Sequence, residues 1–376
     1  MHRLLRVIPD PLKRAVRHLP FADHLRTLVS GRPRPSETVP GALRPVVYPP
    51  TWLRWDEMKQ RPQFILEAFA KAGHDVFFVD TSEPAVRRTE HVTIVPSLRH
   101  VPGSSPILYV HFAPIRHVFD RFEDPVIVYD VLDDLSIYDD EEDGLPEGRR
   151  VRAHHAFVMA RADVAMVSNG VLFERHRAER ADLVRVENGV DVAAFSAETS
   201  RPDDLPPGAV VGYHGMISTW FDFDLLDGVA AARPDWTLVL VGPVDDRVRS
   251  RLEQSIAAAN VVWLGERPSR EMPAYASAFD VGVIWFRIDP MTEGVTPLKM
   301  FEYLAAGTPC VSTPLPAAVA TDGVTTAATA SELVVAIDQA MSEDPARIRR
   351  IGSGHDWTTR LEPVLERLDA AGRRRY

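Results

Sequence analysis

The feature that most constrains this chain is a repeated alternation of short apolar runs with helical stretches. The runs are rich in Val and Ile and show no polar alternation, as a parallel sheet buried on both faces requires. The predicted strands of the first half are Val46–Tyr48, Asp75–Val79, Val92–Val95, Ile107–Val110, Val126–Tyr129, Val164–Val167 and Leu183–Val186. Those of the second half are Val210–Tyr213, Thr237–Val241, Val261–Leu264, Val281–Trp285 and Cys310–Ser312.

The pattern restarts after a polar, Pro-rich interval at Glu198–Pro207. The predicted helices are Asp56–Ala72 and Glu147–Ala160 before it, and Phe223–Ala231, Arg247–Ala258, Glu271–Ala278 and Pro297–Ala306 after it. Two successive βα runs predict two doubly wound α/β domains, at 44–200 and 201–356, with a C-terminal helix at 357–376 packing back on the first domain. Ligands of such sheets bind beyond the carboxyl ends of the strands, so we expect the active site in a cleft between the domains.

Composition excludes several classes of protein. A net charge of −10 over 376 residues argues against general nucleic-acid binding, which needs clustered Lys and Arg. The single cysteine, Cys310, rules out an intrachain disulfide and a zinc site built on several thiolates. The phosphate-binding pattern GxxxxGK[ST], the dinucleotide pattern GxGxxG and the zinc helix HExxH are all absent, which argues against a kinase, a simple dehydrogenase or a zincin.

The N-terminal segment 1–43 has a different character. Its first 36 residues hold eight Lys/Arg and two Asp, and an apolar face recurs at Leu5, Ile8, Leu12, Val16 and Leu19. One interpretation is a helix in peripheral contact with an anionic membrane. The alternative is a basic arm that is frayed or docked on the acidic body, since several prolines interrupt the helix. Because no long apolar span or signal peptide is expected, we predict a cytoplasmic protein, peripheral at the inner face of the membrane if the first interpretation holds.

The stretch from Thr296 to Pro309 is the most informative for chemistry. Thr296 suits an N-cap, Pro297 the first helical position, and Gly307 the residue after the helix. The predicted short helix follows a flexible-looking loop, and its N-terminus offers unpaired N–H groups and a positive dipole end to an anion.

Two charged residues on this helix strengthen the expectation of a phosphate site. Lys299 adds a positive charge in the first turn, and Glu302 lies three residues later on the same face. A phosphate beside Lys299 would bring an attached ribose close to Glu302, whose carboxylate can accept hydrogen bonds from ribose hydroxyls. On spacing alone, a solvated Lys–Glu pair on a capped helix explains the residues equally well.

The run from Pro297 to Gly307 resembles the donor-site helix of GT-B glycosyltransferases, particularly family 4 and teichuronic-acid-type enzymes. The resemblance extends over most of the chain, through Trp55-Asp56, Gln60-Arg61-Pro62, Gly73-His74-Asp75-Val76, Tyr129–Asp134, Asn188–Asp191, Tyr213-His214-Gly215, Val241-Gly242-Pro243 and Leu264-Gly265. It implies a GT-B fold, two Rossmann-like domains facing across a cleft. It also implies transfer of a sugar from a nucleoside diphosphate sugar to a cell-envelope glycan or a lipid-linked acceptor. No cofactor and no metal are expected, and retention of anomeric configuration is favoured over inversion.

The resemblance also implies roles for individual residues. The donor-binding candidates are Lys299, Glu302, Arg287, Thr296, Gly215 and Glu293. Two features depart from the family pattern. In the family pattern a second glutamate is separated from Glu302 by seven intervening residues, which would place it at Gly294, so Glu293 is one position off. The loop after Gly215 also lacks the paired Arg and Lys that often hold the diphosphate. Arg287 is the candidate for that work; a solvated surface arginine is the alternative.

The catalytic candidates on the acceptor side are His111, Asp133 and Asp134. His111 follows a predicted strand, where a histidine can face an acceptor or be purely structural. Asp133 or Asp134 could act as a general base. Alternatively, Asp130 and its neighbours could bind a divalent ion, cap the next helix or form a solvated loop.

Two other functions remain open at this point. One is a GT-B epimerase acting on a nucleotide sugar, which needs no acceptor. The other is a catalytically degenerate protein that binds a nucleotide sugar as part of a larger complex. The aromatic run Trp220–Phe223 is expected to pack in a core and not to bind sugar.

Overall fold

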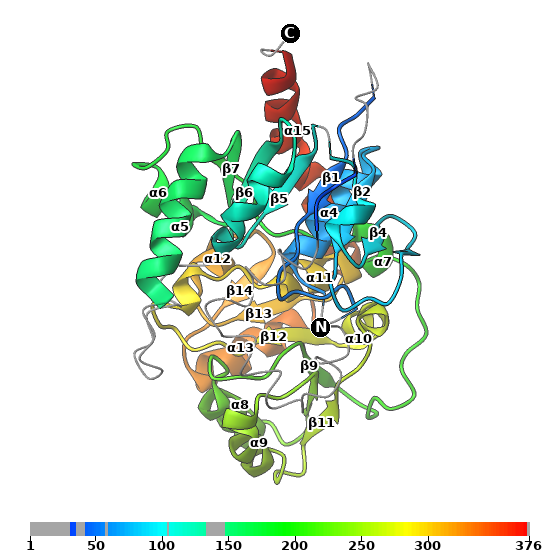
Figure 1. The fold of residues 1–376 in the computed structure, drawn as a ribbon. Helices are drawn as coiled ribbons and strands as arrows, with labels where there is room; N and C mark the ends of the chain where they lie inside the picture. The colour runs from blue at the N-terminus through cyan, green and yellow to red at the C-terminus, as the bar shows by residue number, and fades with distance from the viewer. Residues whose placement is uncertain (1–30, 35–41, 57–58, 104, 133–146, 374–376) are drawn as a thin grey trace. The chain divides into compact units, whose positions relative to one another are not determined.

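A computed structural model describes residues 31–34, 42–56, 59–103, 105–132 and 147–373, which form two compact units (Figure 1). Unit 1 comprises the chain up to Val167, His176–Val184 and the chain from Leu361 onward; unit 2 comprises Ser168–Arg175 and Arg185–Arg360. The C-terminal segment thus belongs to unit 1, and residues 185–200 belong to unit 2. The expected membrane-contact helix and the candidates Asp133 and Asp134 lie outside the described residues.

The sheet of unit 1 has eight strands in the order β3-β4-β2-β1-β5-β6-β7-β8. Its strands are β1 (Val46–Tyr48), β2 (Val76–Val79), β3 (Arg87–Arg88), β4 (Thr93–Val95), β5 (Ile107–Val110), β6 (Val126–Val131), β7 (Val164–Val167) and β8 (Val184–Arg185). The accompanying helices are α4 (Arg61–Lys71), η1 (Leu98–His100), η2 (Ala113–Arg121), α5 (Glu147–Arg161) and most of α15 (Trp357–Arg373). Helix α6 (Gly170–His176) belongs to unit 2 except for its last residue, His176. The β3–β4 pair is antiparallel, and the pairings of β1, β2, β4, β5, β6 and β7 are parallel.

The sheet of unit 2 has six strands in the order β11-β10-β9-β12-β13-β14, all paired in parallel. Its strands are β9 (Val210–His214), β10 (Thr237–Val241), β11 (Val261–Gly265), β12 (Val281–Ile284), β13 (Cys310–Ser312) and β14 (Val324–Thr326). The helices are α7 (Val192–Phe195), α8 (Phe223–Ala232), η5 (Asp246–Val248), α9 (Arg249–Ser255), η6 (Ser269–Glu271), α10 (Met272–Ala278), η7 (Thr292–Gly294), α11 (Leu298–Ala306), α12 (Pro316–Val319), α13 (Ala330–Ala340), α14 (Pro345–Gly352) and η8 (Ser353–His355).

Alternation along β9 shows why helices cover both faces of this sheet. The Tyr213 ring contacts Phe221 at 5.1 Å, and Phe221 contacts Phe223, the first residue of α8, at 4.8 Å. Gly212 points the other way, where a Cβ atom would lie 2.1 Å from the Phe279 ring that follows α10. Phe221 and Phe223 are each 1% exposed, so the expectation that this aromatic run packs in a core is confirmed.

Every predicted strand is present within two residues of its predicted ends, and the expected α/β class is confirmed. The prediction missed β3 and β14, which are too short and too polar to stand out. It was wrong about the start of the first helix, since α4 begins at Arg61 and not at Asp56. The backbone N–H of Gln60 donates to Gln63 Oε1 (3.0 Å), and Pro62 lies in the first turn, where its missing N–H costs nothing.

No helix in the described part of the chain combines the length and the apolar character needed to cross a bilayer.

A buried ion pair ties the second half of β6 to α4. The Asp130 carboxylate is fully buried and accepts hydrogen bonds from Arg61 Nε (2.9 Å), Arg61 Nη2 (3.1 Å) and the Tyr109 hydroxyl (2.6 Å). Both carboxylate oxygens are therefore occupied by donors within unit 1. Asp130 therefore has a structural role in joining β6 to α4. The alternative that Asp130 and its neighbours bind a divalent ion stays a prediction, because Asp133 and Asp134 lie outside the described residues.

We expect Asp130→Ala to lower the free energy of unfolding by about 3–5 kcal/mol, because it removes the carboxylate from a buried guanidinium. The control is Asp56→Ala, which removes an exposed partner of Arg87 and is expected to cost about 0–1 kcal/mol. Urea denaturation of both variants measures the difference, and equal losses would contradict the structural role of Asp130.

Candidate functional site

Two glycine loops meet at the carboxyl edge of the unit 2 sheet. Gly215 follows β9 with φ 122°, and Gly242 follows β10 with φ 146°. The Gly215 N–H donates to the Val241 carbonyl (2.8 Å), and a Cβ atom on Gly242 would lie 2.2 Å from the Gly215 carbonyl oxygen. Only glycine permits this backbone conformation and this approach, so the two strand ends form a surface of bare peptide groups.

Lys299, in the first turn of α11, lies against this surface. Its Nζ atom is 5.0 Å from the ring centroids of both Tyr213 and Phe286, and a Cβ atom on Gly215 would lie 3.0 Å from its Cε. Burial lowers the pKa of Lys299 to about 8, although the Glu302 carboxylate opposes the shift. At neutral pH the side chain therefore presents a charged ammonium, stabilised by two aromatic faces, beside the glycine loops.

Glu302 lies one turn further along α11 and brings a carboxylate to the same place. Its side chain is 13% exposed, and its Oε2 atom is 3.5 Å from Nε2 of His214, the last residue of β9. The His214 ring packs edge-on against Tyr303 (4.9 Å), and the His214 backbone N–H donates to the Tyr303 hydroxyl (3.1 Å). Lys299, Glu302 and His214 are thus held together by the packing of α11 on β9.

Buried polar atoms around α11 have no hydrogen-bond partner within the described residues. They are His214 Nε2, Thr296 Oγ1 and Thr313 Oγ1. His214 ends β9, Thr296 precedes α11, and Thr313 follows β13. Because an unsatisfied buried polar group costs about 1–3 kcal/mol, its presence in a folded protein calls for a ligand or a bound water.

The start of α11 differs from the prediction. The helix begins at Leu298 with Pro297 as the N-cap residue, so the prediction that Thr296 caps the helix was wrong. The Thr296 carbonyl is instead held by Asn188 Nδ2 (2.6 Å). Gly307 ends the helix with φ 82°, as predicted.

The loop before α11 is a compact hydrogen-bonded turn, although the sequence suggested a flexible loop. The Asp289 Oδ1 atom accepts from the N–H groups of Met291 and Thr292 (2.9 Å each), and the Thr292 hydroxyl donates to the Arg287 carbonyl (2.6 Å). Asn169 Nδ2 donates to the Gly294 carbonyl (2.6 Å). These contacts fix the N-terminus of α11 before any ligand binds.

The remaining donor-side candidates are exposed. The Arg287 side chain is exposed and has no partner within the described residues, although its backbone N–H donates to the Trp220 carbonyl (2.8 Å). Glu293 is exposed in η7. The structure therefore gathers Lys299, Glu302 and Gly215 closely and gives no contact that joins Glu293 to them.

His111 lies in unit 1, directly after β5. Its Nδ1 atom is 3.0 Å from the Tyr48 hydroxyl, and the two rings stack at 5.6 Å. Burial lowers the pKa of His111 to about 4, so the ring is neutral at physiological pH. His214 belongs to the Tyr213-His214-Gly215 motif, but no role in the site was predicted for it from the sequence. Its position at the end of a predicted strand, directly before a glycine, was the feature that could have indicated such a role.

Comparison with solved structures identifies the fold. The chain superposes on sucrose-phosphate synthase from Thermosynechococcus elongatus (16% identity, TM-score 0.60, covering 89% of this chain and 98% of that one). It also superposes on Anabaena HepE in complex with UDP-glucose (15% identity, TM-score 0.62, 86% and 99% covered). The two α/β units with parallel sheets therefore have the GT-B glycosyltransferase fold.

Sequence comparison identifies a protein family that matches part of unit 2. Residues 217–343 match the family model Glycosyl transferases group 1, so this segment is a group 1 glycosyl transferase domain. The chain is also 34% identical over 182 residues to the putative teichuronic acid biosynthesis glycosyltransferase TuaH of Bacillus subtilis. That alignment covers 46% of this chain and 46% of TuaH, so the match spans about half the length of this relative.

The buried His214 ring generates a prediction about stability in acid. Burial, and then the charge of Lys299, lower the pKa of His214 to about 3, below the usual 6.5. Between these pH values the unfolded chain takes up a proton at this residue and the folded chain does not. Stability contributed by the neutral ring is therefore complete above pH 6.5 and falls by about 1.4 kcal/mol per pH unit as the pH drops towards 3.

We expect His214→Gln to lose less stability than the wild type between pH 6.5 and pH 4. Chemical denaturation across this range measures the slope, and His91→Gln, at a histidine whose side chain is 31% exposed, is the control. An acid slope unchanged by His214→Gln would show that the ring is protonated in the folded protein.

Proposed function

We propose that this chain is a glycosyltransferase that moves a sugar from a nucleoside diphosphate sugar to a cell-envelope glycan or a lipid-linked acceptor. The observation that carries the proposal is the group of Lys299, Glu302 and the unpartnered His214 Nε2 atom beside the glycine loops of a group 1 glycosyl transferase domain. HepE, solved with UDP-glucose, supports a nucleotide-sugar donor, and the name of TuaH supports a cell-envelope acceptor.

In the proposed mechanism, unit 2 binds the donor and stabilises its leaving group. Charge develops on the diphosphate as the sugar departs, and Lys299 and the free N–H groups at the start of α11 neutralise it. The exposed Arg287 guanidinium is available as a second cation with a geometry suited to phosphate. Glu302 accepts hydrogen bonds from the ribose hydroxyls.

We further propose that transfer needs no metal and retains the anomeric configuration. Lys299 and Arg287 supply positive charge that can neutralise the diphosphate without a metal ion. Retention of the anomeric configuration is the outcome favoured by the family 4 resemblance. On the acceptor side, the neutral His111 ring is the candidate for contact with the acceptor. Peripheral membrane contact through the N-terminal segment remains a prediction.

The first test concerns the donor site. Lys299→Met and Glu302→Gln are each expected to weaken binding of the nucleoside diphosphate by about 1.5–3 kcal/mol, because each removes a charged hydrogen-bond partner. This is roughly a tenfold to hundredfold rise in Kd, measured by calorimetry. Because the pKa of Lys299 is about 8, wild-type affinity should fall as the pH rises through 8, and Lys299→Met should not show this fall.

The matched control is Glu253→Gln, which neutralises an exposed glutamate on α9. It should leave affinity unchanged. Wild-type affinity in both Lys299→Met and Glu302→Gln would remove the donor-site assignment.

The second test concerns the reaction. Incubation with a panel of nucleoside diphosphate sugars and with extracted envelope glycans and lipids should release nucleoside diphosphate only when an acceptor is present, and EDTA should not abolish turnover. NMR of the product should show the anomeric configuration of the donor. Conversion of the donor without an acceptor would support the alternative function of a nucleotide-sugar epimerase. Binding of the donor without turnover would support a catalytically degenerate protein. Loss of turnover in EDTA, restored by Mg²⁺ or Mn²⁺, would contradict metal independence.

A further inference from the structure

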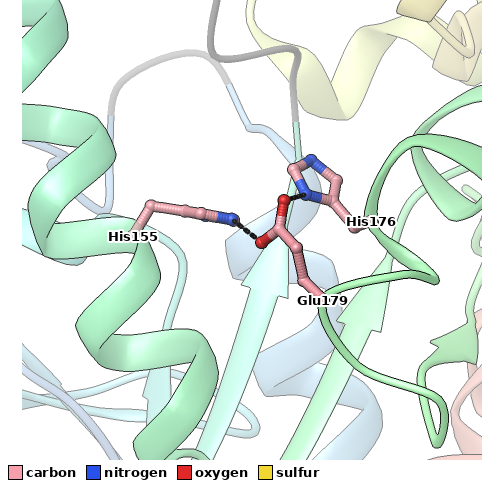
Figure 2. Close-up of side chains that lie close together, drawn as sticks. All are labelled: His155, His176 and Glu179. Atoms are coloured by element: carbon pink, nitrogen blue, oxygen red, sulfur yellow. Dashed lines mark hydrogen bonds and ion pairs between the residues drawn. The ribbon is translucent and has the colours of Figure 1, made fainter.

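A cluster of two histidines and a glutamate lies in unit 1 and includes no residue assigned to the donor (Figure 2). His155 belongs to α5, His176 is the last residue of α6, and Glu179 lies in the turn that follows. Figure 2 shows the Glu179 carboxylate between the two rings. Glu179 Oε2 is 3.2 Å from His155 Nε2, and Glu179 Oε1 is 3.1 Å from His176 Nδ1.

We propose that His155, His176 and Glu179 form a binding site for a divalent transition-metal ion of the Zn²⁺ type. Each residue directs one ligand atom inward, and these atoms all lie within 4.8 Å of one another. Tetrahedral ligands at about 2.1 Å from a zinc ion are themselves roughly 3.4 Å apart. The two separations from Glu179, 3.2 and 3.1 Å, are close to this spacing, and the widest separation within the group is at most 4.8 Å.

Burial gives the cluster the form of an enclosed site with one open side. The side chains of His155 and His176 are 4% and 9% exposed, whereas that of Glu179 is 46% exposed. The histidines are fixed by the surrounding core, and Glu179 leaves a path by which an ion and a water ligand can enter. Three protein ligands and one water complete the four positions that zinc prefers.

The hydrogen bonding of His155 also suits a metal ligand. The His155 Nδ1 atom lies 2.8 Å from the Tyr129 hydroxyl. With Nδ1 protonated and donating to Tyr129, the Nε2 lone pair faces the cluster, which is the usual arrangement of a metal-binding histidine with an outer partner.

The donor set determines which ion is expected. Two imidazole nitrogens and one carboxylate oxygen suit Zn²⁺ and its neighbours in the first transition row, whereas Mg²⁺ and Ca²⁺ prefer oxygen ligands throughout. A bound ion would link α5 to the end of α6. It would stabilise the folded chain by mass action and take no part in leaving-group stabilisation.

The test is a zinc titration of the untagged, EDTA-treated chain against a chromophoric chelator. The wild type should bind one equivalent of Zn²⁺, raise its Tm on binding, and give the visible absorption of four-coordinate cobalt when Co²⁺ is used. Tyr129→Phe removes an outer partner and should lower zinc affinity by roughly 10- to 100-fold. His155→Ala and His176→Ala each remove a ligand and should lose more affinity than Tyr129→Phe.

Two further variants separate metal binding from misfolding. Glu179→Gln keeps a hydrogen-bond acceptor at a half-exposed position, so it should fold with the wild-type Tm without metal and still lose zinc affinity. His91→Ala removes a partly exposed imidazole beside Glu90 and should bind zinc as the wild type does. Absence of stoichiometric binding, or wild-type affinity in Glu179→Gln and both cluster histidine variants, would show that these residues form only a hydrogen-bonded network.

Discussion

The candidate donor site depends on how closely α11 packs on the sheet of unit 2. Gly282 in β12 has no side chain, and a Cβ atom there would lie 2.4 Å from the Tyr303 ring. This contact brings the Tyr303 hydroxyl within 3.1 Å of the His214 N–H and fixes the helix against the end of β9. Lys299 and Glu302 are positioned because they share this helix. A larger residue at position 282 would displace both charges together.

The site combines full charges with a poorly hydrated setting. Lys299 lies over two aromatic rings, the His214 ring is held neutral by its burial, and two threonine hydroxyls remain without partners within the described residues. Groups arranged in this way are partly desolvated before a ligand arrives, so they interact with an anion more strongly than they would in water. The hydrogen-bonded turn before α11 adds to this preorganisation, because the free N–H groups of the helix are already in place.

Unit 1 contains two carboxylates that face buried nitrogen side chains, with different consequences. Asp130 is fully enclosed and receives hydrogen bonds from Arg61 and Tyr109 on its two oxygens. Glu179 faces two imidazoles, which can be neutral and can exchange their protons for a metal ion, and half of its side chain is exposed. The difference lies in the partner: a guanidinium is a permanent cation, whereas an imidazole can become a ligand.

The sequence determined the α/β class, nearly all the strands and the helix that carries Lys299 and Glu302, because these follow from local apolar patterns, turn residues and spacing along one helix. The tertiary structure alone decided that His214 joins that pair, that Asp130 is neutralised by Arg61 from 69 residues away, and that His155 meets Glu179. Each of these contacts joins separate segments through sheet order and helix packing, and single-chain periodicity carries no information about such pairings. The N-cap of α11 was misassigned as well: the helix begins after Pro297, and the Thr296 carbonyl accepts a hydrogen bond from Asn188, 108 residues away in the sequence.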